Sequence, residues 1–206
     1  MNIIAKVDKL KRSKIKKIVE SRIREFEEIG KNPSGIFSEM CFCIMTANFQ
    51  AEKSIKIQEE LKDGFCNLGK EDLAKKLGEL GHRFPNTRAE YICGARKFRE
   101  EIINKVKNLD EFELREWLVK NIRGLGMKEA SHFLRNIGFK NLAIIDFHII
   151  DLLTREKLIG NLDKKVTKKR YLEIEDVLKN IALRLNLNLA ELDLYLWYIE
   201  TGKVLK

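Results

Sequence analysis

The segment with the clearest chemical meaning is a glycine turn followed by a lysine. Gly124-Leu125-Gly126 lies between two short helical patterns, and Lys128 falls on the first turn of the second one. Glycines let a backbone approach a ligand closely, and the N-terminus of a helix presents free N–H groups to an anion. The pattern predicts a helix-hairpin-helix that binds a DNA phosphate, with Lys128 as a candidate nucleophile at its edge.

A carboxylate follows this turn at a spacing that could bring it beside the lysine. Asp146 opens the segment Asp146-Phe147-His148, eighteen residues after Lys128. The order of turn, lysine, helix, connector, aspartate and helix can set the carboxylate near the amine. Exposed Lys–Asp pairs contribute little, however, and an aspartate at the start of a helix also serves as an N-cap. The residue types alone leave catalysis and capping as equal alternatives for Asp146.

The elements that position these residues are expected to be helices. No stretch alternates with a period of two for long enough to build a sheet, and Ala143-Ile144-Ile145 need not be a strand. The segment from Ile36 to about Ala47 is apolar nearly all round, which predicts a helix at the centre of the fold. Thr87-x-x-Glu90 has the pattern of a capping box. Helices are expected over residues 15–29, 36–47, 51–61, 70–80, 87–106, 110–119, 151–158, 169–185 and 189–201.

The predicted architecture is therefore all-α. We expect two helical lobes with a cleft between them and a helix-hairpin-helix at about 115–138, whose second helix is closed by Gly138 as a C-cap. A chain of 206 residues can form one large domain or two small lobes that share a core. We expect a single unit that spans 1–206.

The composition indicates a polyanionic partner. Lysine and arginine total 40 against 31 acidic residues, a formal net charge of +9. This balance fits nucleic acid, although a lysine-rich surface used only for solubility would give the same count. No signal peptide opens the chain and no apolar stretch approaches the length of a membrane span. We expect a cytoplasmic protein that binds no membrane.

The cysteines do not predict a metal site. The chain has four cysteines without a C-x-x-C pair, and Cys41 and Cys43 would point to different sides of a helix. Free thiols in a reducing compartment are the expected state.

Taken together, these motifs resemble the helix-hairpin-helix base-excision DNA glycosylases. The resemblance runs from about Ile36 to the C-terminus. Its diagnostic elements are Gly124-Leu125-Gly126, Lys128 and Asp146-Phe147-His148. Three further segments are most similar to the archaeal-type 8-oxoguanine DNA glycosylase/AP lyases: Arg83-Phe84, the helix from Tyr91 to Arg99, and the ending Trp197-Tyr198…Gly202 to Lys206. The cysteine cluster that follows this fold in endonuclease III relatives is missing, which argues against the iron–sulfur branch.

The resemblance implies a bifunctional enzyme from a prokaryote, most closely an archaeon. The Lys128 amine would attack C1′ of the damaged nucleoside, expel 8-oxoguanine and form a Schiff base, and β-elimination would then nick the strand. Asp146 would stabilise the oxocarbenium charge and assist proton transfers. The amine must be neutral to attack. A desolvated pocket and the positive helix end disfavour the ammonium form, whereas a nearby carboxylate favours it.

The resemblance also implies contacts with the flipped base and with DNA. Trp197 and Phe84 would stack on the base, and Lys206 would lie near it. Without the resemblance, a tryptophan at 197 could simply cap the core and a last residue is usually mobile. Residues expected to contact DNA are Asn48, Phe49 and Gln50, which would fill the vacated stack, together with Gly124, Gly126 and His148. An ordinary interhelical loop at 48–50 and a structural role for His148 are the alternatives.

The implied partner is double-stranded DNA that contains an oxidised base, bound by a monomer. No cofactor is required, although the hairpin carbonyls could hold a monovalent cation. Two other functions compete. One is a glycosylase for another oxidised base, such as an oxidised pyrimidine, and the other is a non-catalytic helix-hairpin-helix module that binds DNA. Such a module needs neither Lys128 nor Asp146.

Overall fold

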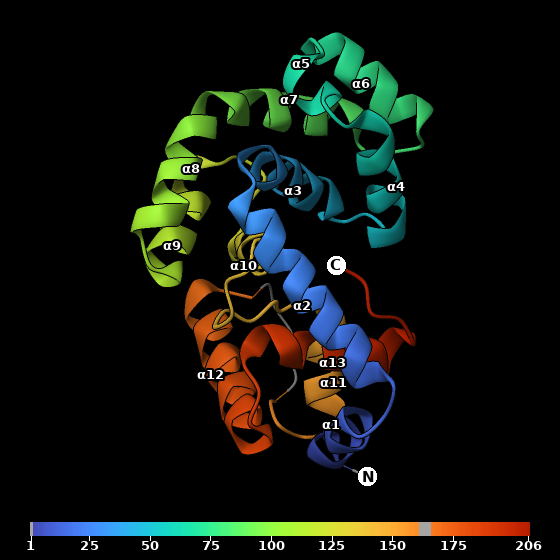
Figure 1. The fold of residues 1–206 in the computed structure, drawn as a ribbon, viewed down its shortest axis with the longest axis vertical. Coiled ribbons are helices and arrows are strands. Elements are labelled where there is room, and N and C mark those ends of the chain that lie inside the picture. The colour runs from blue at the N-terminus through green and yellow to red at the C-terminus, as the bar shows by residue number, and fades with distance from the viewer. Residues whose placement is uncertain (1, 161–165) are drawn as a thin grey trace.

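Helices joined by turns make up the protein in a computed structural model that describes residues 2–160 and 166–206 (Figure 1). No strand occurs in that part of the chain, which confirms the all-α prediction. Nor does any helix there have the length and apolar character needed to cross a membrane. The helices are α1 (Ile3–Lys11), α2 (Ile15–Lys31), α3 (Pro33–Thr46), α4 (Ala51–Leu61), α5 (Gly64–Asn67), α6 (Lys70–Glu79), α7 (Pro85–Ala95), the 3-10 helix η1 (Arg96–Phe98), α8 (Arg99–Asn108), α9 (Glu111–Asn121), α10 (Met127–Asn136), α11 (Phe147–Arg155), α12 (Lys168–Leu185) and α13 (Leu189–Thr201).

Two hydrophobic cores organise these helices. Buried residues between Ile36 and Leu142, in α3 to α10, form the first core. The second core combines the N-terminal helices α1 and α2 with α11, α12 and α13. The start of the chain therefore completes a unit made by its end, and Figure 1 shows α1, α11 and α13 at the opposite end of the molecule from α5 and α6. The two cores correspond to the two predicted helical lobes.

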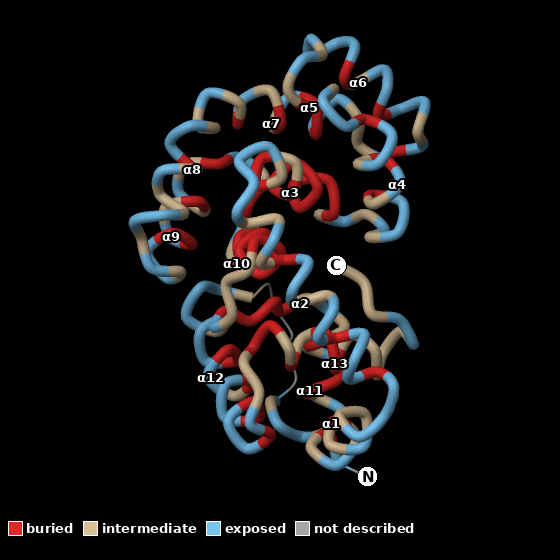
Figure 2. Tube along the Cα trace, viewed as in Figure 1, coloured by how far each residue is buried: buried red, intermediate tan, exposed pale blue. Residues whose placement is uncertain are grey.

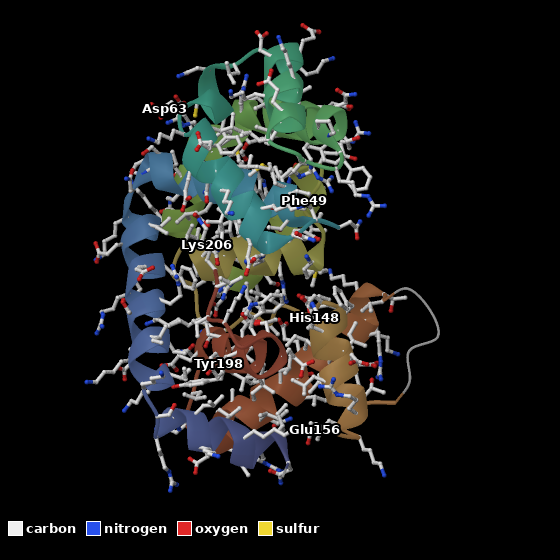
Figure 3. All side chains as sticks on the ribbon, turned by 90° about the vertical axis from the view of Figure 1, so that its right-hand side faces the viewer. Phe49, Asp63, His148, Glu156, Tyr198 and Lys206 are labelled. Carbon is white, nitrogen blue, oxygen red and sulfur yellow. The ribbon has the colours of Figure 1, made fainter. Side chains whose placement is uncertain are left out.

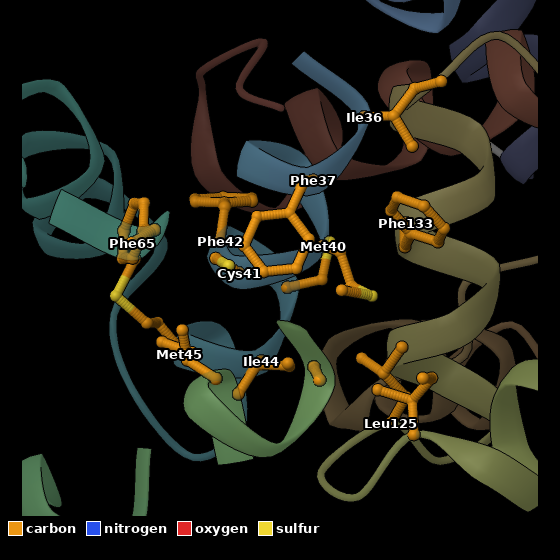
Figure 4. Close-up of a cluster of buried hydrophobic side chains, with 14 of the residues drawn as sticks. Ile36, Phe37, Met40, Cys41, Phe42, Ile44, Met45, Phe65, Leu125 and Phe133 are labelled. Carbon is orange, nitrogen blue, oxygen red and sulfur yellow. The ribbon is translucent and has the colours of Figure 1, made fainter. Parts of the chain in front are cut away.

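Helix α3 is the centre of the first core. Asn32 caps it by accepting hydrogen bonds from two backbone N–H groups, and Pro33 occupies the first helical position, so the helix starts before the predicted Ile36. The segment from Glu39 to Thr46 is buried on all sides (Figure 2). Figure 4 shows its side chains lying between those of Phe65 and Phe133. This burial confirms what the all-round apolar pattern predicted.

Helix α10 lies between the two cores. It is buried from Ala130 to Asn136 and packs against α2, α3 and α9. Gly30 of α2 permits a close crossing, because a Cβ there would lie 2.1 Å from the backbone oxygen of Ile137. Gly138, with φ +99°, follows the end of α10 in the left-handed conformation expected of a terminating glycine. Helix α9, the turn at 122–126 and α10 form the predicted helix-hairpin-helix.

The stretch predicted as one helix over 87–106 is divided. Helix α7 starts at Pro85, whose fixed φ suits the first helical position. Thr87 therefore lies inside the helix, and the predicted capping box of Thr87 and Glu90 is wrong. A 3-10 turn over Arg96–Phe98 then separates α7 from α8.

Two further boundaries differ from the prediction. The helix expected over 151–158 begins earlier, because the Asp146 side chain accepts a hydrogen bond from the Ile149 N–H and caps α11. Helix α1 was not predicted: Ile3, Val7 and Leu10 lie at helical spacing, but the pattern extends over only nine residues.

A buried ion pair joins the two cores. Arg115 of α9 donates two hydrogen bonds to Glu175 of α12, at 2.6 and 2.9 Å, and both side chains are buried. Glu175 also accepts from the Ala143 N–H, and Arg115 donates to Ser131. Desolvating two charges is costly, so the pair stabilises the junction only while both partners are present.

We predict that Arg115→Met lowers the free energy of unfolding by about 3–5 kcal/mol, because the Glu175 carboxylate would remain buried without a counter-charge. Urea titration followed by circular dichroism measures the loss. The double variant Arg115→Met/Glu175→Gln should recover part of it, since a neutral amide still accepts from Ala143. A loss below about 1 kcal/mol for the single variant, the range of an exposed pair, would contradict this role.

Candidate active site

A pocket of about 1290 Å³ collects most of the predicted site residues. The α3–α4 connection, the N-terminal ends of α10 and α11, α13 and the C-terminal tail all contribute to its lining. Figure 3 shows Phe49 on the upper part of the molecule, His148 on the lower part and Lys206 between them. The predicted residues in the lining are Asn48, Phe49, Gln50, Gly126, Lys128, Asp146, His148, Trp197 and Lys206.

Lys128 lies on the first turn of α10, at the edge of the pocket. Its side chain is 27% exposed, and its ammonium lies 3.2 Å from a carboxylate oxygen of the neighbouring Glu129. Gly126 precedes the helix as its N-cap without a capping side chain, so the first N–H groups of α10 face outward from a bare turn. A cation, a helix N-terminus and a pocket therefore coincide at Lys128.

Asp146 lines the same pocket from the start of α11. One of its carboxylate oxygens accepts the Ile149 N–H at 3.0 Å, which makes it the N-cap of that helix. No ion pair joins Asp146 to Lys128 among the described residues. The capping alternative is thus present in the structure, and the cap leaves the second carboxylate oxygen available to the pocket.

Aromatic rings form one wall. The ring of His148 lies 5.2 Å from Trp197, edge to face, and 3.8 Å from Phe147. Phe147 is 71% exposed, while the indole N–H of Trp197 is buried without a partner in the part of the chain that the structure describes. The predicted partner of Trp197 was Phe84, but the structure places His148 beside Trp197, and both of these residues line the pocket.

Phe84 and Gly124 are the predicted site residues that do not line the pocket. Phe84 is the N-cap of α7, and its ring lies 5.1 Å from the guanidinium of Arg83 and 5.7 Å from that of Arg88. Gly124 has φ +96°, and a Cβ there would lie 2.6 Å from the ring of Tyr91. The turn itself requires this glycine.

Lys206 reaches the pocket at the end of the chain, but its ammonium points into the first core. There it makes an ion pair of 2.6 Å with Glu39, a buried residue of α3. The resemblance placed the lysine near a flipped base, and the structure places its tail in the pocket lining with the charge already paired.

Several lining residues were not predicted from the sequence. His132 lies one turn after Lys128 on α10 and lines the pocket, although no role was predicted for it. Arg135 of α10 and Asp193 of α13 also line it and form a buried ion pair of 3.1 Å. Burial raises the pKa of Asp193 to about 6, a shift that Arg135 opposes and Asp146 reinforces. Helical phase on α10 was the available signal for His132 and Arg135, since both follow Lys128 at one and two turns.

Comparison with solved structures shows the same overall fold. A structure of Methanocaldococcus jannaschii 8-oxoguanine glycosylase/lyase with a 15mer DNA containing 8-oxoguanine superposes with a TM-score of 0.96 at 49% identity, covering 99% of each chain. The 8-oxoguanine DNA glycosylase of Thermotoga maritima gives a TM-score of 0.94 at 43% identity, covering 99% of this chain and 98% of that one.

Sequence comparison defines the family. Residues 19–187 match the family described as 8-oxoguanine DNA glycosylase. The 8-oxoguanine DNA glycosylase/AP lyase of Korarchaeum cryptofilum is 52% identical over 208 residues, which cover 100% of this chain and 98% of the relative. The protein of the same name from Methanocaldococcus jannaschii is 50% identical over 209 residues, covering 100% of both. The chain belongs to the 8-oxoguanine DNA glycosylase family.

We predict that ionisation of Asp193 lowers the free energy of unfolding as the pH rises. Its folded pKa of about 6 exceeds the ordinary value of 3.8, so the folded state favours the protonated carboxyl and this stability is lost as the pH rises from about 4 through about 6. Over that range the free energy of unfolding of the wild type should fall relative to Asp193→Asn. The change is on the order of 3 kcal/mol at most, at about 1.4 kcal/mol per pKa unit. Urea titrations at a series of pH values measure it, and a relative gain in wild-type stability would show that Arg135 dominates.

Proposed function

We propose that this protein excises 8-oxoguanine from double-stranded DNA and cleaves the strand at the resulting site, as a bifunctional DNA glycosylase/AP lyase. The observation that supports this most is the position of Lys128. Its partly exposed amine lies on the first turn of α10, the second helix of the helix-hairpin-helix, in a pocket that Asp146 also lines. Relatives that carry this name match the chain over its full length.

Lys128 supplies the nucleophile. The lone pair of its neutral Nζ forms a bond to C1′ while the N-glycosidic bond breaks, and the electron pair of that bond leaves with the base. Loss of a proton and opening of the sugar give a Schiff base. Removal of a C2′ proton then expels the 3′ phosphate by β-elimination, which nicks the strand. The Nζ lies 3.2 Å from a carboxylate oxygen of Glu129, and Lys128 must lose a proton before it can attack.

Asp146 provides the negative charge for the reaction. Its position at the N-terminus of α11 fixes the carboxylate through the Ile149 N–H. The free oxygen can stabilise the positive charge that develops on the sugar and can accept or return protons. A carboxylate that is held in place by its cap does this without reorganisation, so capping and catalysis are compatible roles.

The flipped base is proposed to stack on Trp197, which lines the pocket beside His148. Phe84 can complete the stack only if DNA brings the segment at 83–84 toward the pocket. The bare turn at Gly124 and Gly126 is proposed to bind a phosphate through its backbone N–H groups. The loop residues Asn48, Phe49 and Gln50 are proposed to fill the space that the base leaves in the duplex.

The chemistry requires no cofactor, and one chain supplies every proposed site residue, which supports action as a monomer. A monovalent cation at the hairpin is a separate proposal. The turn at 122–126 offers neutral carbonyl oxygens, which suit a hard cation, although the Ile122 oxygen already accepts the Leu125 N–H at 3.2 Å. Such a cation would steady the turn and its phosphate contact.

Two alternatives remain distinct from this proposal. A non-catalytic DNA-binding module would not need the amine and the carboxylate in one pocket. A glycosylase for another oxidised base would keep both and differ in the wall around Trp197. Activity on a panel of oxidised purines and pyrimidines separates these functions.

We predict that borohydride traps a covalent adduct between the wild-type protein and a duplex containing 8-oxoguanine, because it reduces the Schiff base. Lys128→Gln should lower the yield by at least about 100-fold, since an amide cannot form the intermediate. Denaturing gel electrophoresis measures the adduct. Lys53→Gln is the matched control, an exposed lysine of the same pocket, and should retain the adduct. An undiminished adduct with Lys128→Gln would remove Lys128 from the mechanism.

Asp146 can be tested by separating its two roles. Asn at 146 keeps an oxygen that caps α11, so the free energy of unfolding should change by less than about 0.5 kcal/mol, whereas Ala should cost about 1 kcal/mol. The single-turnover rate of base excision should fall on the order of 100-fold or more with Asp146→Asn. Normal excision by this variant would leave Asp146 with the capping role alone.

A further inference from the structure

Side chains of the first core bind the ammonium of the C-terminal lysine, Lys206. The Lys206 Nζ donates to Glu39 at 2.6 Å and to the side-chain oxygen of Gln58 on α4. It also lies 4.6 Å from the centroid of the Phe42 ring. A carboxylate, an amide oxygen and an aromatic face therefore surround one ammonium. Glu39 and Lys206 are 167 residues apart in sequence.

Glu39 is itself fixed before the tail contributes. Its Oε1 accepts from the Gln58 Nε2 at 3.1 Å, and its Oε2 accepts from the Asn136 Nδ2 of α10 at 2.9 Å. Glu39 is only 3% exposed. A carboxylate buried to this degree is costly without a counter-charge, and Lys206 supplies one. Docking of the tail therefore neutralises a charge that the core already holds in place.

The tail that carries Lys206 lies between the two sets of helices. Gly202, with φ +73°, ends α13 and turns the chain, and Lys203 pairs with Glu52 of α4. Figure 1 places the C-terminus beside α2, on the side of α4. Leu205 and Lys206 line the pocket, whereas Glu39 and Gln58 do not. Glu39 can thus act on the pocket only indirectly, through the tail or through Asn136 of α10.

We propose that Glu39, together with Gln58, is a positioning residue for recognition of the damaged base. It draws the Lys206 ammonium into the core, so that the main chain and terminal carboxylate of the tail, rather than the ammonium, form the pocket wall. This inference rests on the proposed function. It assigns the specificity of the tail to the 2.6 Å ion pair between Lys206 and Glu39, a residue that does not line the pocket.

His132 lines the same pocket as the tail residues Leu205 and Lys206. Its imidazole is 8% exposed, lines the pocket and has no partner for Nε2 in the described part of the chain. Burial lowers the pKa of His132 well below its ordinary value, while the Lys206 backbone opposes that shift. A neutral imidazole presents one donor and one acceptor to the polar edge of a base.

The two activities of the enzyme separate positioning from folding. Base excision requires the base to be recognised, whereas strand cleavage at a preformed abasic site requires only the sugar and Lys128. We expect Glu39→Gln to lower the ratio of the 8-oxoguanine excision rate to the abasic-site cleavage rate by roughly 10- to 100-fold, the effect of a displaced binding group. Single-turnover kinetics on the two duplexes measure this ratio in the full-length protein.

Glu175→Gln is the matched control, because Glu175 is another buried glutamate in an ion pair and does not line the pocket. It should lower both rates in parallel or neither. Gln58→Met, which removes one acceptor and keeps the Glu39 charge, should give a smaller decrease in the same ratio. If Glu39→Gln folds poorly, Gln58→Met tests the same contact in its place.

Lys206→Met completes a double-mutant cycle. It should slow excision as much as Glu39→Gln does, and the double variant should be no worse than either one. An unchanged ratio for Glu39→Gln, or a parallel loss of both rates, would overturn the proposal. So would full excision by Glu39→Gln alongside loss by Lys206→Met, which would show that the ammonium itself contacts the base. A wild-type protein inactive on both duplexes would instead contradict the proposed function.

Discussion

Helix α10 must bury polar side chains, and their pairing decides where Lys128 lies. Seven consecutive residues from Ala130 to Asn136 are buried between the two cores. A buried polar group costs free energy unless it has a partner, so each one constrains the helix. The partners come from four helices: Arg115 of α9 and Tyr171 of α12 for Ser131, Asp193 of α13 for Arg135, and Glu39 of α3 for Asn136.

Those contacts make the position of the lysine a property of the whole fold. Rotation or sliding of α10 would break several buried hydrogen bonds at once, and the Arg115–Glu175 pair beside it would lose its alignment. The N-terminal turn of the same helix is bare and opens on the pocket. A rigid helix therefore presents Lys128 at its exposed end. Glu39 extends the same arrangement to the tail, since it binds both Asn136 and Lys206.

Local features of the sequence were sufficient to predict most of the helices and the hairpin, but not α1 or α5. Gly124 and Gly126 mark the turn, where Gly124 has a positive φ, and helical phase put Trp197 off the buried face of α13. The aspartate at 146 was recognisable as a helix start. These signals work because each one depends on neighbours within a few residues.

Contacts between distant segments could not be predicted in this way. The residues around Glu39 do not indicate Lys206 as its partner, and those around Glu175 do not indicate Arg115. A charged residue within an apolar helix has no local sequence pattern from which its partner could be predicted. Phe84 was placed by resemblance, and the structure puts its ring between two arginines, outside the pocket lining. His132 was overlooked because a lone histidine is informative only once its surroundings are known.

Peptide mapping of the borohydride-reduced protein–DNA adduct by mass spectrometry tests the central claim most directly, because it locates the covalent bond. With a duplex containing 8-oxoguanine, the sugar remnant should be found on the peptide that contains Lys128. A remnant attached to any other lysine or to the N-terminal amine would contradict the account.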